Sequence, residues 1–453
     1  GPIIDQMGLA KRVYSGIFSA EVDLPGDISL DWISAYSKIM SSIVSDENTL
    51  PRNGALAGVI GLSEVFLVER YDENSSHELR FASGNEQRLR WAGGANFIKS
   101  ESISSCVAGV SSFNPASFTC RPIQEVETLG IFGGLYYDLT QQLTLSGEIR
   151  FQNDDISVPA GGFQNDFDDV GGRLTLEYSP RDNLMYFVNY ARGFRPGGFN
   201  TIFAVLTPEE AASLTANSGA SLDVDPETLD QIEFGVKGGW FDQRMQGSAV
   251  GYWGEINVQQ VTQVTNYTDR NGVEQIITVN NNIGVLGLYG IELEGAFAAT
   301  EELMLEATFA WNYTEYKEGA CVTCVNRGSL ATDQDHLGNQ TPWVPEFTGS
   351  AVATYTRPIK AELDGFARLE FLYESTKYAT EANKFETGDR TLVNLRLGVD
   401  HEAYRAEFYV TNLFDNETYF NVSNNTDLDD FGNAWVVGLP DRRAIGVRAF
   451  LNF

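Results

Sequence analysis

The chain has 453 residues and a net charge of −31 at pH 7, from 62 acidic and 31 basic side chains. This balance excludes a nucleic-acid-binding protein, because binding to phosphates needs clustered Lys and Arg. No apolar run reaches the roughly 18 residues of a transmembrane helix, although a membrane strand, which is only half apolar, would escape this criterion. Forty-four glycines and 12% aromatic residues favour an all-β protein.

Strict alternation of apolar and polar residues predicts strands along the whole chain. In the stretch LTLSGEIRF, Leu143, Leu145 and Ile149 face one way, while Glu148 and Arg150 face the other. The same criterion places 17 strands at residues 12–24, 28–40, 75–83, 87–98, 125–138, 142–152, 168–178, 183–194, 229–240, 245–257, 286–298, 303–313, 345–356, 361–373, 389–400, 403–413 and 443–453.

The lengths and connections of these strands indicate a membrane barrel. Runs of about ten to thirteen residues suit a tilted bilayer crossing, whereas the strands of a soluble sandwich average about five or six. Tight turns such as PGD, GNE and SPRD alternate with long loops, as periplasmic turns alternate with extracellular loops in outer-membrane barrels. We therefore expect a ligand to bind at the long loops, residues 41–74, 99–124, 195–228, 258–285, 314–344 and 414–442.

The parity of the strands carries a further expectation. The first connection is short and the last is long, so the first strand starts outside the cell and the last ends in the periplasm. Single-chain bacterial barrels have an even number of strands. The chain also begins with GPIIDQMGLAKR, without an initiator Met or a secretory signal. We therefore expect it to be processed, trimmed or part of a larger protein.

Several stretches resemble TonB-dependent outer-membrane receptors, from about residue 12 to the C-terminus. The stretch NYARGFRPGGFN resembles their aromatic-x-x-Gly-Phe-Arg-x-Pro segment, and PETLDQIEFGVKGGWFDQRMQGSAVGYW resembles their strand-turn-strand signature one long loop later. GIELEGAF, LVNLRLGV and EFYVTNLFDNETYF resemble the late-barrel segments, and AIGVRAFLNF resembles the closing strand. The resemblance implies an all-β, antiparallel transmembrane barrel of the 22-strand type over residues 1–453, with about five strands and the N-terminal plug absent from this chain. A companion chain or the remainder of a longer product would supply them.

The resemblance also implies a function and partners. The expected function is energised uptake of a bulky nutrient, such as a ferric siderophore, another complex or a glycan, across the outer membrane of a Gram-negative bacterium. The expected partners are outer-membrane lipid, the TonB complex acting through the plug, and the barrel-assembly machinery. Two alternatives are a passive porin or channel, and a structural barrel subunit of a surface assembly.

Candidate ligand and rim residues follow from the stretch at 189–200. Strand 183–194 rises to the extracellular rim, and the glycines and Pro196 end it there. Arg192, Arg195 and Phe199 are the candidates to contact a ligand. The alternative for the two arginines is that they lie at the water interface and pair with carboxylates.

The four cysteines lie in predicted extracellular loops, where oxidation is expected. Cys106 and Cys120 would close a 15-residue loop as a disulfide, and Cys321 and Cys324 would form a second pair. The CVTC spacing also suits a redox or zinc half-site, but no histidine-rich partner motif is visible.

Charged residues on the polar faces predict a hydrated lumen wall, represented by Glu148, Arg150, Glu292, Glu294 and Arg396. A receptor would use the same wall to contact its plug. On the closing strand, Leu451 and the terminal Phe453 point to lipid and resemble a signal for barrel assembly. No spacing of residues indicates catalysis, a cofactor or a metal site. DQDH at 333–336 and the aspartates of NNTDLDDFG at 424–432 are only weak metal signals.

Overall fold

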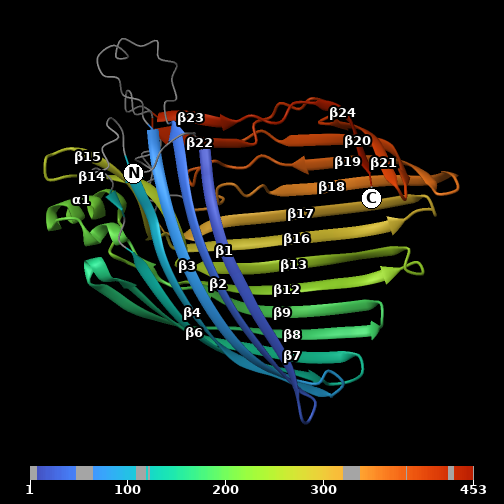
Figure 1. Cartoon of the computed structure of the whole chain (residues 1–453), viewed down its shortest axis with the longest axis horizontal. Coiled ribbons are helices and arrows are strands. Elements are labelled where there is room, and N and C mark those ends of the chain that lie inside the picture. The colour runs from blue at the N-terminus through green and yellow to red at the C-terminus, as the bar shows by residue number, and fades with distance from the viewer. Residues whose placement is uncertain are drawn as a thin grey trace.

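A computed structural model shows the protein as one wide, strongly curved antiparallel sheet with small elements gathered at one end (Figure 1). The structure describes residues 8–46, 65–108, 119–120, 123–319, 337–383, 385–426 and 433–451. The sheet has 18 strands within these residues, of which β5 (Thr119–Cys120) has only two residues. The others are β1 (Gly8–Leu24), β2 (Ile28–Asp46), β3 (Val65–Ser83), β4 (Leu89–Ala108), β6 (Gln124–Asp138), β7 (Leu143–Val158), β8 (Phe163–Arg181), β9 (Leu184–Arg195), β12 (Glu227–Trp240), β13 (Met245–Asn257), β16 (Val285–Ala298), β17 (Leu303–Glu318), β18 (Phe347–Lys360), β19 (Leu363–Glu374), β20 (Arg390–His401), β21 (Tyr404–Thr411) and β24 (Ala444–Leu451).

All 17 predicted strands are present, and each pairs with the next long strand along the chain, from β1–β2 to β21–β24. Several of these strands are longer than predicted and continue toward the loop side. Among the described residues no pairing joins β24 to β1, so the sheet is open between these two strands.

The two ends of the sheet differ as the connections predict. The tight turns lie at one end together with the end of β24, and the longer connections lie at the other end with the start of β1 (Figure 1). The turn at residues 25–27 joins β1 to β2, and Gly26 adopts a φ of 89°, a left-handed conformation that costs glycine little.

The two faces of the sheet have opposite chemistry. One face carries apolar side chains that are largely exposed in the isolated chain, such as Leu135, Ile149 and Phe234. The register places Glu148 opposite Arg173 on the other face, where their side chains form an ion pair of 2.8 Å. An apolar outer face and a polar inner face are the pattern of a barrel that crosses a lipid bilayer.

Buried apolar residues gather in the loop layer, outside the membrane-facing part of the sheet. Ile156, Val158 and Phe199 form one cluster, and Leu214, Ala220 and Val279 form another. Because the barrel wall turns its apolar side chains toward lipid, only the loop layer needs a protein core of its own.

The small elements of this loop layer were not predicted. They include α1 (Pro208–Ser218), the 3-10 helices η2 (Pro159–Gly161) and η3 (Thr201–Ala204), and three short antiparallel pairs. The pairs are β10 (Gly198–Phe199) with β11 (Asp223–Val224), β14 (Gln260–Thr268) with β15 (Glu274–Asn282), and β22 (Asn421–Thr426) with β23 (Asn433–Gly438). In the described ranges no helix has the length and apolar character needed to span a membrane.

Candidate functional site

The rim candidates at the end of β9 lie in three different settings. Arg192 pairs with Asp230 of β12 at 3.1 Å, and the Tyr190 hydroxyl donates to the same carboxylate at 2.7 Å. Tyr190 shares a face of β9 with the exposed Tyr186 and Val188, so this ion pair lies on the outer, lipid-facing side of the wall, next to the loops.

Arg195 and Phe199 are not brought together with Arg192. Arg195 ends β9 opposite Glu227 and is exposed. Phe199 is only 8% exposed and packs against Phe163 with ring centroids 6.1 Å apart. Phe199 therefore belongs to the core of the loop layer in this structure.

A folded cover lies over this end of the barrel, formed by residues 198–225 and the β14–β15 hairpin. Asn200, which is 5% exposed, joins the two parts: its side-chain Nδ2 donates to the carbonyl oxygens of Ser221 and Asn280, at 2.8 Å each, and its Oδ1 accepts from the Asn280 amide at 2.8 Å. One asparagine thus ties two segments 80 residues apart.

Helix α1 is fixed to the same hairpin by Glu210. Thr207 caps the helix and exchanges hydrogen bonds with Glu210 in a capping box. The Glu210 carboxylate also accepts from the backbone amide of Arg270 at 3.0 Å and from its guanidinium at 3.1 Å. These contacts, the Thr207 amide first, lower the pKa of Glu210 from 4.5 to about 2.

The stretch TPEE carries the signal for this helix start, since a Thr followed by Pro and then by Glu at the third helical position is a capping box. The contact with Arg270 could not be read from the sequence, because it joins loops 60 residues apart.

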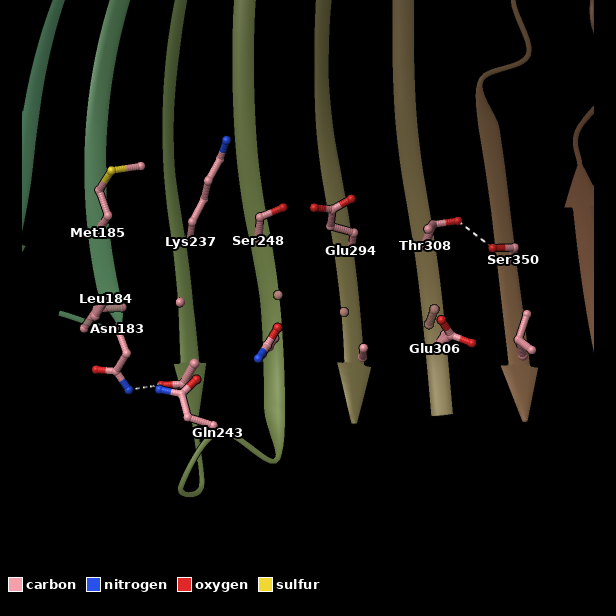
Figure 2. Close-up of a pocket in the computed structure, with 18 of the residues that line it drawn as sticks. Asn183, Leu184, Met185, Lys237, Gln243, Ser248, Glu294, Glu306, Thr308 and Ser350 are labelled. Atoms are coloured by element: carbon pink, nitrogen blue, oxygen red, sulfur yellow. Dashed lines mark hydrogen bonds between the residues drawn. The ribbon is translucent and has the colours of Figure 1, made fainter. Parts of the chain in front are cut away.

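The polar face of the sheet holds a cavity of about 840 Å³ near the tight turns. Figure 2 shows the side chains that line it standing on neighbouring strands, with Lys237, Ser248, Glu294 and Thr308 on β12, β13, β16 and β17. Thr308 and Ser350 share a hydrogen bond of 2.7 Å across β17 and β18. Glu294 therefore lies on the polar face of the sheet together with these side chains.

The other predicted lumen residues occupy the same face. Glu292 lies two residues from Glu294 on β16. Arg396 lies 3.9 Å from Glu370. Glu148 and Arg150 line a second cavity of about 510 Å³ between β3 and β9. Charges of both signs alternate over this wall, which suits a water-filled or protein-filled passage.

The closing strand β24 carries a charged side chain on one face and an exposed apolar side chain on the other. Arg448 donates to the buried Glu407 at 2.8 Å on the polar side. Leu451 is 65% exposed on the other side. Phe453 lies outside the described residues.

Two of the four cysteines have a described backbone. The register of β4 with β5 places Cys106 directly opposite Cys120. Cys321 and Cys324 lie outside the described residues, as do the candidate metal motif at 333–336 and the aspartates at 427, 429 and 430. In the described part of the chain, no group of three or more His, Cys, Asp or Glu side chains could hold a metal ion.

Comparison with known proteins decides the family. The family model described as TonB dependent receptor-like, beta-barrel, matches residues 17–413. The chain belongs to this family. As a TonB-dependent receptor barrel it is assigned to the outer membrane of Gram-negative bacteria.

Solved structures agree with the fold of this TonB-dependent receptor barrel. The ferric yersiniabactin uptake receptor FyuA from Yersinia pestis is 18% identical, with a TM-score of 0.71 over 98% of this chain and 62% of that chain. The siderophore receptor PiuA from Acinetobacter baumannii is 16% identical, with a TM-score of 0.69 over 97% of this chain and 64% of that chain. The chain thus spans less than two thirds of the length of these two receptors.

Proposed function

We propose that this chain is the barrel part of a receptor that takes up a ferric complex, such as a siderophore, by TonB-dependent energised transport. The observation that carries the proposal is the family match over residues 17–413. Several structural relatives favour an iron complex, since FyuA is described as a ferric yersiniabactin uptake receptor, PiuA as a siderophore receptor and FecA as a ferric citrate transporter.

The geometry supports passage of a bulky ligand. The polar inner wall holds cavities of about 840 and 510 Å³ in this chain. These volumes fall in the range of roughly 300–1,000 Å³ that small-molecule sites occupy. The cover formed by α1 and the β14–β15 hairpin places a folded layer, with its own buried clusters, where an external ligand would first arrive.

The function is tested by uptake of radiolabelled iron in cells that express the full-length protein and lack other iron receptors. We expect a ferric siderophore or ferric citrate to enter only while the proton gradient is intact, so that a protonophore abolishes uptake. A passive porin would instead continue to equilibrate the probe after the gradient collapses. Uptake that is insensitive to the protonophore would overturn the proposal.

A further inference from the structure

The cavity of about 510 Å³ between β3 and β9 contains a positive charge without a carboxylate partner. Four arginines contribute to its lining, and one of them, Arg192, pairs with Asp230 at 3.1 Å. Arg80 pairs with Glu78 at 2.7 Å, and Arg173 pairs with Glu148 at 2.8 Å. Arg150 makes no ion pair within the described part of the chain, and the only side chains that it contacts by hydrogen bonds are neutral amides.

The guanidinium of Arg150 is nevertheless held in a defined position. Its Nε and Nη2 donate to Gln152 Oε1 at 3.0 and 2.8 Å, and Nη2 also donates to Asn96 Oδ1 at 3.1 Å. The remaining nitrogen, Nη1, has no partner among the residues that the structure describes.

A further hydrogen bond orients the side-chain amide of Gln152. Gln152 Nε2 donates to Asp154 at 2.8 Å, which turns Gln152 Oε1 toward Arg150. Asp154 is 3% exposed and accepts from Thr128 Oγ1 at 2.5 Å. The acidic group that stabilises this arrangement thus acts on the amide and does not contact Arg150.

The wall beneath Arg150 leaves room for the guanidinium to lie against it. A Cβ atom added to Gly130 would lie 2.4 Å from Arg150 Nη2 and 2.2 Å from Asn96 Oδ1. Any side chain at this position would displace the two groups. Glycine here therefore leaves space beside the backbone for the guanidinium of Arg150, which lines the cavity.

From this geometry we infer that Arg150 is a binding site for a carboxylate group presented from inside the barrel. Among the described residues no carboxylate balances the charge of this half-buried guanidinium. Its planar donors match the two oxygens of a carboxylate. Tyr136 and the ring of Phe132 line the same cavity. The carboxylate comes either from the transported complex or from a polypeptide segment that occupies the lumen. The first source rests on the proposed uptake function, and the second does not.

Zero-length crosslinking tests this site in the full-length protein in outer-membrane vesicles. In an Arg150→Lys variant, a carbodiimide activates a carboxylate that contacts the new amine. The amine attacks the acyl carbon, an amide forms with net loss of one water, and a urea leaves. The matched control is Arg90→Lys on the same wall, because Arg90 pairs with Asp138 at 2.6 Å and its lysine should couple to that residue. Heat-modifiable gel mobility confirms that both variants are folded.

Mass spectrometry of the digest identifies the coupled carboxylate. We expect an amide from residue 150 to a carboxylate outside the wall strands, either on a lumen-filling segment or on citrate when ferric citrate is the probe. The first product assigns the site to a protein segment and the second to cargo. If residue 90 couples to Asp138 while residue 150 couples to nothing, or only to Glu148 or Asp154, the inference is wrong. Iron uptake by the unsubstituted receptor, measured separately, decides the proposed function independently of this result.

Discussion

At the scale of single residues, buried polar side chains join the segments of the loop layer by hydrogen bonds, as backbone hydrogen bonds join the strands of the wall. Asn200 satisfies two carbonyls and one amide of segments that share no long strand pairing. Glu210 is 4% exposed and still ionised, because it accepts from two backbone amides and one guanidinium. A buried charge is tolerated only when it is paired and hydrogen-bonded in this way.

The low pKa of Glu210 makes the attachment of α1 dependent on pH. Its pKa of about 2 in the folded cover lies below its ordinary value of 4.5. A lowered folded-state pKa gives stability that is present above about 4.5 and is lost as the pH falls toward about 2. We expect pepsin to cleave within residues 208–218 increasingly as the pH falls through this window.

The Glu210→Gln variant provides the comparison for this prediction. It lacks the titrating group, so cleavage of the helix should already be rapid at the upper end of the window and should follow only the intrinsic activity of pepsin, calibrated on a free peptide. Equal pH profiles for the two proteins would contradict a role of the Glu210 charge in holding the cover.

At the scale of elements, the register of β4 with β5 brings two cysteines to directly opposite positions. Opposed residues in an antiparallel pair have Cα atoms about 4.5–5.5 Å apart. This separation falls within the range of about 4.4–6.8 Å found in disulfides. This backbone register is compatible with a bond between Cys106 and Cys120, which stays a prediction, and the second pair lies outside the described residues.

We predict that Cys106 and Cys120 form a disulfide in the protein isolated from outer membranes. The bond would form by thiol–disulfide exchange with a disulfide-containing oxidant of the periplasm, which is reduced to its dithiol. A digest under non-reducing conditions should contain the two cysteine peptides joined, and reduction should separate them. Closing a 15-residue loop contributes about 3 kcal/mol in the chain-entropy account, so the Cys106→Ser and Cys120→Ser double variant should lose up to about that much local stability. Complete alkylation of both thiols without reduction would exclude the bond.

At the scale of the whole molecule, the sheet separates lipid from the lumen residue by residue. Leu293 is 42% exposed on the apolar face of β16, between the inward-facing Glu292 and Glu294. Its register partner is Ala249, while Ser248, the next residue of β13, lies opposite Glu294 on the lumen side. Two adjacent register pairs thus face two different solvents.

This separation predicts that arginine destabilises the barrel at one of two neighbouring sites and has little effect at the other. Leu293→Arg places a cation in the hydrocarbon and should destabilise the folded barrel by about 2–4 kcal/mol. Ser248→Arg places the same side chain in the polar cavity beside Glu294 and should change stability little. Urea unfolding of the full-length receptor in lipid vesicles, followed by gel mobility, measures both. Similar losses for the two variants would show that the faces are assigned wrongly.

The amino-acid sequence by itself determined the strands of the wall and the side of the sheet that each residue faces. Alternation over ten or more residues is a local property, and a polar or apolar side chain at each position leaves only one register that places every apolar group in lipid. The resemblance to known receptors could be recognised in the sequence for the same reason, since its motifs lie within single strands and their adjoining turns.

Only the tertiary structure decided what lies between the strands and how the polar side chains pair. The contacts of Asn200 with Asn280 and the ion pair of Glu210 with Arg270 join loops 60 to 80 residues apart in sequence, and Phe199 packs against Phe163. No local pattern encodes these contacts. The sequence likewise predicted Arg150 only as one of several charged residues of the lumen wall. It differs from its neighbours because the register gives Arg173 a carboxylate and gives Arg150 only amides, and that difference depends on which strands lie side by side.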